Sequence, residues 1–177
     1  MLIPFSELFN RHRVKRTGVL HLGANLGQEA PHYFQLGFQP VVWVEALPEL
    51  CRQLQAGIGI YPGSVVLQAC LGDMDGETVQ FNVASNMGQS SSYLVFGTHS
   101  QEHPSVVFTR KVEMKTERLD TLLERNSIVP GPDWFLNIDL QGAELKALKG
   151  MGDLLKQFKY AYIEVNEKEL YKGCPLV

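Results

Sequence analysis

Short apolar runs recur along the chain and predict buried β-strands. They are rich in β-branched and aromatic residues and mostly lack polar alternation, which is typical of parallel strands covered on both faces. The runs occupy residues 18–22, 41–44, 65–69, 134–138 and 160–165. Helix-like segments over residues 28–37 and 48–56 separate the first three runs, and Pro48 and Gly57 bound the second of them in typical positions. The chain is therefore predicted to begin as β-α-β-α-β.

A different pattern interrupts this alternation between residues 72 and 116. Asp75 followed by Gly76 predicts a tight turn, and alternating apolar and polar positions over residues 78–83 and 106–115 predict antiparallel strands. A polar stretch, residues 85–92, lies between them. We expect an inserted antiparallel β element that acts as a lid.

The parallel pattern resumes after the insertion. A short helix is expected at about residues 117–125, and a second one from Gly142 to about Lys149, after the 134–138 strand. The predicted fold class is α/β, a doubly wound, mainly parallel, Rossmann-like sheet with an antiparallel β insertion. Ligands of such sheets bind at the carboxyl ends of the strands.

The length and charge of the chain limit the class of protein. A chain of 177 residues is expected to form a single domain, residues 1–177, since domains are commonly about 100 to 200 residues long. The net charge is −3 and, apart from a short basic run over residues 11–16, the Lys and Arg residues are scattered. The sequence therefore predicts no broad cationic face, which argues against a nucleic-acid substrate.

Cysteine usage and hydropathy predict a soluble cytoplasmic protein. The three cysteines, Cys51, Cys70 and Cys174, are odd in number and lack CxxC spacing, as expected of reduced thiols. The first residues contain no apolar stretch long enough for a signal peptide, and no run approaches the roughly 18 residues of a membrane span. We expect no membrane association.

Candidate ligand-binding residues follow the first two strands. The first strand leads into a glycine loop, residues 23–27, where Gly23 and Gly27 allow a tight turn and a close approach of the backbone to a ligand. The second strand ends at Glu45, where a carboxylate accepts hydrogen bonds from both hydroxyls of an adenosine ribose. A plain strand-to-helix turn and a solvated Glu45 are the alternatives. The loop lacks the three glycines of the dinucleotide fingerprint GxGxxG.

The fourth parallel strand contributes a second candidate group. Asp139 follows the strand directly, so we expect Asp139 and Gln141 at the mouth of the same crevice, with Asp139 facing an ammonium group or orienting an acceptor hydroxyl. The alternative is that either residue caps the helix near Gly142. A functional role is favoured because a carboxylate buried at the end of so apolar a strand requires a partner.

Three segments, residues 20–28, 44–46 and 137–150, resemble the FkbM family of class I, S-adenosylmethionine-dependent methyltransferases. The resemblance covers roughly residues 17 to 172. Within the single domain we expect a cofactor-binding half (16–71), a β insertion or lid (72–116) and a second half (117–177). The resemblance implies O-methylation of a sugar or natural-product hydroxyl, with S-adenosylhomocysteine as product. The cofactor contacts that the resemblance implies are Gly23, Ala24, Asn25, Gly27, Gln28 and Glu45. The full set of contacts that we expect also includes Leu22, Ala46, Asp139 and Gln141.

Class I methyltransferases usually end in an antiparallel strand pair, which this sequence does not predict. Residues 167–170 have a helix-like pattern, and Val177 follows seven residues later. If the pair is missing, an exposed sheet edge favours a homodimer.

Other motifs give alternative interpretations. Asp73 and Asp75 resemble the DxDG opening of haloacid-dehalogenase-type phosphatases, but a hairpin turn explains the same residues. His99 and His103 have a spacing that binds zinc only on a helix with a third ligand. Solvated loop histidines are favoured over a general base, and no metal site is predicted. Asp139 is the first candidate catalytic residue, followed by His99 or His103. A NAD-dependent oxidoreductase and a non-catalytic methyltransferase-like binding module are the alternative functions.

Overall fold

The computed structural model describes residues 4–177, which form two compact units. The first unit contains the described residues up to Gln68, together with Val129–Ile138 and Asp153–Tyr162. The second contains Ala69–Ile128, Asp139–Gly152 and Ile163–Val177. Residues 1–3 lie outside the described residues. They begin the N-terminal segment that is predicted to contain no signal peptide. The single domain over residues 1–177 and its three divisions stay predictions.

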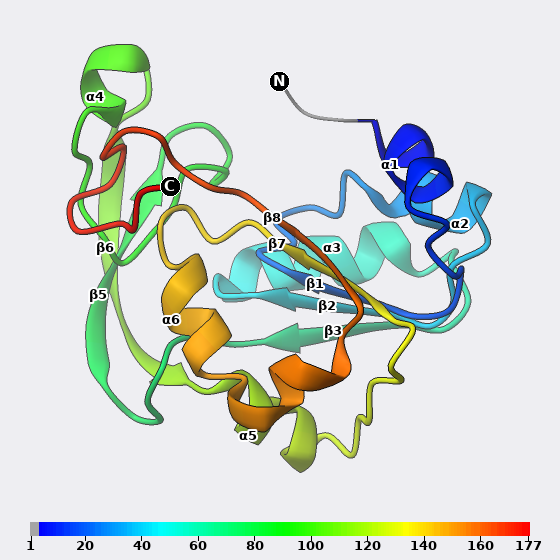
Figure 1. Cartoon of the computed structure of the whole chain (residues 1–177). Coiled ribbons are helices and arrows are strands. Elements are labelled where there is room, and N and C mark those ends of the chain that lie inside the picture. The colour runs from blue at the N-terminus through cyan, green and yellow to red at the C-terminus, as the bar shows by residue number, and fades with distance from the viewer. Residues whose placement is uncertain (1–3) are drawn as a thin grey trace. The chain divides into compact units, whose positions relative to one another are not determined.

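A five-stranded sheet forms the first unit, in the order β3-β2-β1-β7-β8 (Figure 1). Its strands are β1 (Val19–Leu22), β2 (Val41–Glu45), β3 (Ser64–Gln68), β7 (Phe135–Ile138) and β8 (Tyr160–Ile163). The pairs β3/β2, β2/β1 and β1/β7 run parallel. Every residue of β1, β2 and β7 is buried, so both faces of these strands are covered. All five predicted runs form strands, but β3 and β8, at the edges of the sheet, are only partly buried.

Three helices of the first unit pack against one face of this sheet. They are α1 (Phe5–Arg11), α2 (Ala30–Gln35) and α3 (Pro48–Ile58). Phe9, Tyr33 and Leu54 from these helices share a core with strand residues of one face, among them Trp43 and Phe135. Because α1 precedes the first apolar strand and has no strong pattern, the sequence did not predict it. A 3-10 helix, η1 (Gly152–Gln157), was not predicted either.

The second unit is built around a three-stranded sheet of order β4-β6-β5. Its strands are β4 (Cys70–Leu71), β5 (Thr78–Ala84) and β6 (Phe108–Glu117), with β5 and β6 antiparallel. The helices of this unit are α4 (His99–Glu102), α5 (Leu119–Arg125) and α6 (Glu144–Lys149). The antiparallel insertion and the two later helices are confirmed, and so is the α/β, Rossmann-like fold class.

The C-terminal segment differs from one expectation. Residues 167–170 contain no helix, and the segment instead forms isolated bridges that pair Tyr171 with Phe96 and Leu176 with Asn166. Main-chain hydrogen bonds between residues 169–172 and residues 95–99 therefore replace the predicted helical turn. Among the described residues, no strand follows β8.

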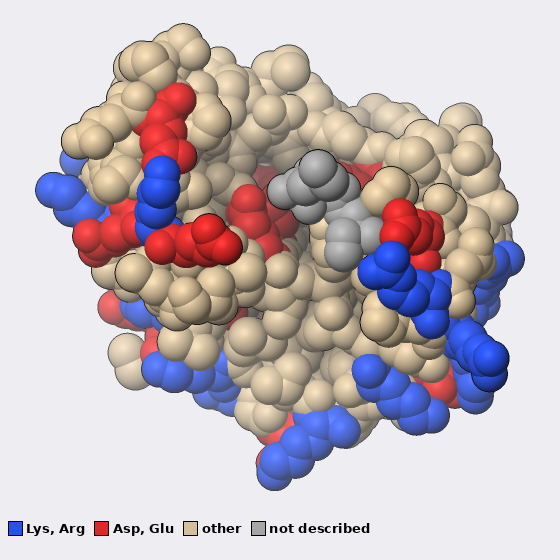
Figure 2. Space-filling model, turned by 45° about the horizontal axis from the view of Figure 1, so that its top comes forward, with Lys and Arg blue, Asp and Glu red and all other residues tan. Residues whose placement is uncertain are grey.

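The cysteines and the surface charges agree with the sequence pattern. Cys51, Cys70 and Cys174 are free and buried. Figure 2 shows Lys and Arg side chains in small groups, several of them beside Asp or Glu. Lys15 and Lys159, for example, both pair with Asp133, at 2.9 and 2.8 Å. Within residues 4–177, no helix has the length and apolar character needed to cross a membrane.

Candidate functional site

The glycine loop connects β1 to the segment before α2 by a sharp turn. Gly23, Asn25 and Gly27 all have positive φ, at 86°, 46° and 72°. Glycine adopts this conformation without strain, whereas other L-residues do so rarely. The main-chain N–H groups of Gly23 and Ala24 both donate to the carbonyl oxygen of Val44, at 2.9 and 3.0 Å. The loop is therefore tied to the carboxyl end of β2.

Glu45 joins the glycine loop to the beginning of α3. Its side chain is 8% exposed. Oε2 accepts a hydrogen bond from the main-chain N–H of Asn25, and Oε1 accepts one from that of Leu47, both at 2.9 Å. Burial raises the pKa of Glu45, while these backbone hydrogen bonds act in the opposite direction. A carboxylate has about four lone-pair sites, so Glu45 retains capacity to accept further donors.

The predicted cofactor contacts of the first unit lie on this loop and on the end of β2. Leu22 and Ala24 are buried in the core, so only their main-chain atoms are suited to contact a ligand. The Gln28 side-chain amide donates to Asn25 Oδ1 at 2.9 Å, on the exposed side of the loop. The full set in this unit is Leu22, Gly23, Ala24, Asn25, Gly27, Gln28, Glu45 and Ala46.

A buried polar group in the strands beneath the loop was missed by sequence reasoning. His21 of β1 is 2% exposed, and its Nδ1 lies 3.2 Å from the hydroxyl oxygen of Tyr33. The Asn137 amide donates to the same hydroxyl at 2.8 Å. Burial lowers the pKa of His21 to about 3, so the imidazole is neutral at physiological pH. Polar residues at paired positions of two apolar strands, His21 and Asn137, were the signal available.

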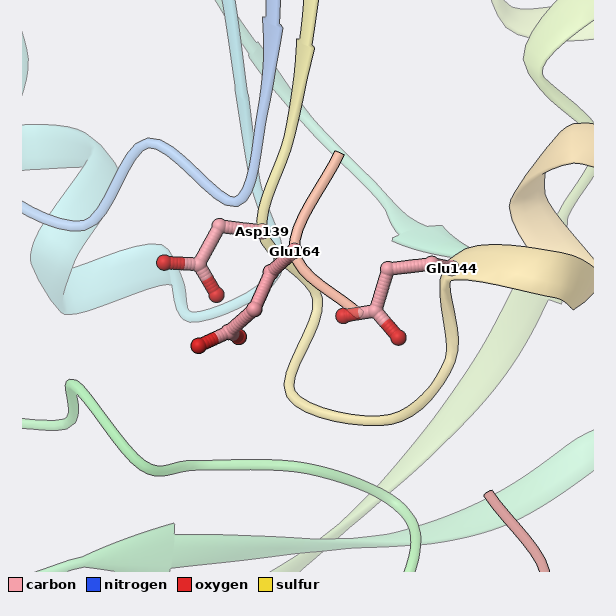
Figure 3. A group of neighbouring side chains, drawn as sticks. All are labelled: Asp139, Glu144 and Glu164. Carbon is pink, nitrogen blue, oxygen red and sulfur yellow. The ribbon is translucent and has the colours of Figure 1, made fainter. Parts of the chain in front are cut away.

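Three carboxylates come together in the second unit. One oxygen each from Asp139, Glu144 and Glu164 lies within 4.8 Å of the others, and Figure 3 shows the three side chains converging. Asp139 and Glu164 are exposed, whereas Glu144 is 4% exposed. The expectation of a buried Asp139 is therefore wrong, because the chain leaves the covered strand at this residue. The buried carboxylate belongs to Glu144, which sequence reasoning did not single out.

The loop of residues 139–142 is held by Glu144 from the first turn of α6. Glu144 Oε1 accepts hydrogen bonds from the main-chain N–H groups of Leu140 and Gly142, at 2.8 and 3.1 Å. The N-cap of α6 is Ala143, without a side-chain cap. The alternative in which Asp139 or Gln141 caps this helix is therefore wrong.

Gln141 connects two of the carboxylates. Its side-chain Nε2 donates to Asp139 Oδ1 at 2.5 Å and to Glu164 Oε2 at 2.9 Å. Its Oε1 accepts a hydrogen bond from the hydroxyl of Tyr171 at 2.6 Å. Sequence reasoning missed Tyr171 and Glu164, because both are far from Gln141 along the chain.

The electrostatics of this group favour protonation. Loss of hydration and the neighbouring Asp139 carboxylate raise the pKa of Glu164 to about 8. Burial likewise raises the pKa of Glu144. Oxygen ligands of this kind suit Mg²⁺ or Ca²⁺, but nearby carboxylates are common without a cation, and the absence of a metal site stays a prediction.

The two histidines of the insertion have different surroundings. His99 begins α4 and is 4% exposed, with its Nε2 3.2 Å from Ser90 Oγ and its ring stacked on Phe96. The prediction of a solvated loop histidine is therefore wrong for His99, because the polar stretch folds inward over it. His103 is exposed, as predicted. Neither histidine belongs to the carboxylate group.

The serines of the polar stretch and the Asp-Gly turn have structural partners. Ser90, Ser91 and Ser92 are buried, which excludes a flexible exposed loop. Asp75 accepts hydrogen bonds from the Arg118 main-chain N–H at 2.8 Å and from the Thr121 hydroxyl at 2.9 Å. These contacts favour the turn over a phosphatase nucleophile.

Comparisons with known proteins agree with the resemblance seen in the sequence. The FkbM methyltransferase domain matches residues 21–177. The 2-O-methyltransferase NoeI of Sinorhizobium fredii is 23% identical over 167 residues, which cover 88% of this chain and 65% of that protein. The chain thus spans 65% of the length of this curated relative. No solved structure matches the chain significantly.

Proposed function

The chain belongs to the FkbM methyltransferase family, and from this premise we propose that it transfers a methyl group from S-adenosylmethionine to a hydroxyl oxygen. The acceptor class that we propose is a sugar or a small natural product. The name of the relative, a 2-O-methyltransferase, supports transfer to oxygen. The observation that carries the cofactor half of the proposal is the position of Glu45, buried behind the glycine loop with acceptor capacity remaining.

The residues of the first unit fit the adenosine part of this cofactor. We assign the ribose hydroxyls to the Glu45 carboxylate, since it is an acceptor that binds two donors at once. The positive φ of Gly23 and Gly27 allows the sharp turn that brings the loop against the Glu45 carboxylate. Asn25 and Gln28 supply side-chain amides on the exposed side of the loop. When bound, S-adenosylmethionine supplies an electrophilic sulfonium methyl and leaves as S-adenosylhomocysteine.

The acceptor side is assigned to the second unit. We propose that Asp139 orients the acceptor hydroxyl and receives its proton, and that Gln141 borders the transfer region. This assignment is supported by the position of both residues in the chain, shortly after β7. It is also supported by the exposure of Asp139, which leaves its carboxylate accessible to a substrate. The insertion, residues 72–116, is proposed to shape the choice of acceptor. The main contribution of the protein is positioning, because methyl transfer requires the acceptor oxygen in line with the sulfonium methyl.

Calorimetry with S-adenosylhomocysteine tests the cofactor assignment. We expect Glu45→Ala to weaken binding by at least about tenfold, since two hydrogen bonds to ribose would be lost. Glu45→Gln, which keeps one acceptor oxygen, should retain part of the affinity. This variant replaces Glu45→Ala as the test if the alanine variant does not fold. Glu49→Ala, a carboxylate deletion four residues further on, is the matched control. Unchanged affinity in a folded Glu45→Ala variant would exclude the ribose assignment.

Two further measurements separate the alternative functions. In a thermal-shift comparison, stabilisation by NAD and not by S-adenosylhomocysteine would favour an oxidoreductase. Binding of S-adenosylhomocysteine without turnover across a panel of sugar and natural-product hydroxyls would favour a binding module. Methylation of a panel compound that is lost in Asp139→Asn would support the proposed reaction and the role of Asp139 in it.

A further inference from the structure

The side-chain amide of Gln141 is hydrogen-bonded at both of its ends. On one end, its NH₂ group donates to the carboxylates of both Asp139 and Glu164. On the other end, its oxygen accepts the hydrogen bond from Tyr171. One amide group therefore bridges two carboxylates that lie side by side (Figure 3). We call Asp139 and Glu164 the carboxylate pair.

Among the residues that the structure describes, no positive charge balances the carboxylate pair. The titratable groups that face Glu164 are Asp139, after β7, Glu144 of α6, and Tyr171 of the C-terminal segment. Lys146 of α6 lies instead 4.0 Å from Asp73 and 3.9 Å from Glu77. Two carboxylates at this separation repel one another, so losing the second proton is unfavourable, and a neutral amide donor relieves only part of that repulsion.

From this geometry we propose that Asp139 and Glu164 hold one proton between them, and that Gln141, anchored by Tyr171, is the positioning residue that keeps the pair together. The upward direction of the Glu164 pKa agrees with this arrangement. The inference rests on the proposed function only for its consequence in catalysis, since the protonation state of the pair exists without substrate.

Tyr171 connects the positioning residue to the insertion. Tyr171 is 1% exposed, and its hydroxyl also lies 3.2 Å from the Ser90 carbonyl oxygen. Ser90 in turn contacts His99 through its own hydroxyl. Gly142 packs directly on Tyr171, because a Cβ at residue 142 would lie 3.0 Å from the Tyr171 Cβ. Tyr171 is thus fixed from two sides, and it fixes which end of the Gln141 amide faces the pair.

The catalytic consequence is a proton acceptor that works near neutral pH. As the bond from the acceptor oxygen to the methyl carbon forms and the carbon–sulfur bond breaks, the hydroxyl proton passes to the pair in its doubly ionised form, which thereby becomes singly protonated. The singly protonated pair then returns that proton to water. The doubly ionised pair is a stronger base than an isolated carboxylate, because repulsion between its two charges raises its proton affinity toward the operating pH.

Titration of the unliganded 177-residue chain tests the inference without any substrate. The probe is carboxyl carbon NMR on protein labelled at Asp and Glu. We expect the Glu164 signal to titrate above pH 6.5 in the wild type, and to move down by at least about one pH unit in Asp139→Asn, which removes the like charge. A wild-type Glu164 midpoint at or below about pH 5, the ordinary range, would overturn the shared proton. An Asp139→Asn midpoint equal to that of the wild type would overturn the pairing.

Tyr171→Phe tests the positioning role. Loss of the anchoring hydroxyl should move the Glu164 midpoint by at least about half a pH unit, and the pH profile of methyl transfer should move with it. Tyr61→Phe, in the first unit, is the matched control and should move neither. A Tyr171→Phe variant with lower stability but an unchanged midpoint would show that Tyr171 is only structural. A normal titration with no methyl transfer on any acceptor would count against the proposed function and leave the shared proton standing.

Discussion

Two loops of this protein follow parallel strands and are each held by a buried glutamate, but the glutamates act over different distances. The glycine loop follows β1, and residues 139–142 follow β7. Glu45, from the neighbouring strand β2, uses one oxygen for the glycine loop and the other for the start of α3. Glu144 uses a single oxygen for two N–H groups that lie within four residues of it.

The difference concerns what each glutamate holds together. Glu45 joins three segments of the chain, so its hydrogen bonds contribute to the packing of a whole unit. Glu144 closes one local turn, and the remaining order of that region comes from side chains, namely Gln141 and Tyr171. Main-chain hydrogen bonds hold the glycine loop, whereas the carboxylate pair is held by a side-chain amide, so we expect the pair to respond more readily to pH and to substitution.

The largest expected effect is on the stability of glutamate variants. Glu45→Ala leaves two main-chain N–H groups without an acceptor, and we expect a loss of about 2 to 4 kcal/mol in the free energy of unfolding. Glu144→Ala should lose about 1 to 2 kcal/mol, because both of its donors lie in one local turn. Urea unfolding of both variants measures the difference. Equal losses would contradict the contrast between the two glutamates.

The next effect is a pH dependence at β1, the strand that leads into the glycine loop. His21 has a folded pKa of about 3, below its unfolded value, so the unfolded state binds more protons between the two values. Its contribution to stability is complete above about pH 6.5 and is lost as the pH falls, by about 1.4 kcal/mol per pH unit. The free energies of unfolding of the wild type and of His21→Asn should therefore converge as the pH falls from 6.5 to 4.5. A constant difference would exclude a buried neutral His21.

Gly27 of the glycine loop and Gly37, which follows α2, separate the effect of packing from that of backbone strain. Gly27 and Gly37 both have positive φ, but a Cβ at Gly27 would lie 2.6 Å from Leu54 Cδ1, while at Gly37 it would meet nothing within 4 Å. Gly37→Ala should cost about 1 kcal/mol from strain alone, and Gly27→Ala about 1 to 2 kcal/mol more. Thermal unfolding of the two variants gives the comparison. Similar costs would show that Leu54 moves aside without penalty.

The smallest effect on folding is expected at the exposed side of the glycine loop. Gln28→Ala removes one exposed hydrogen bond to Asn25, and the free energy of unfolding should change by less than about 0.5 kcal/mol. Binding of S-adenosylhomocysteine should nevertheless weaken a few-fold, if Gln28 contacts the cofactor as proposed. An unchanged affinity would remove Gln28 from the proposed contacts and leave Glu45 unaffected.

Much of the first unit followed from the sequence. The strands were predictable because strands covered on both faces must be apolar along their whole length, as β1, β2 and β7 are. The glycine loop and Glu45 were predictable because a sharp turn after one strand and an acid at the end of the next are local features. The position of Glu45 beside the loop depends on the backbone conformation of the turn and on the order of the strands in the chain. The sequence encodes both directly.

The second site depended on tertiary structure. Glu164 and Tyr171 lie 20 or more residues from Gln141 in the sequence, and no periodicity relates the three. The burial of His99 and Glu144, and the exposure of Asp139, were also decided by which segments fold over them. Side-chain contacts between distant segments depend on how those segments pack, and packing is a property of the whole fold. The sequence therefore determined the strands and the proposed cofactor loop, and only the fold brought Asp139 and Glu164 to one amide.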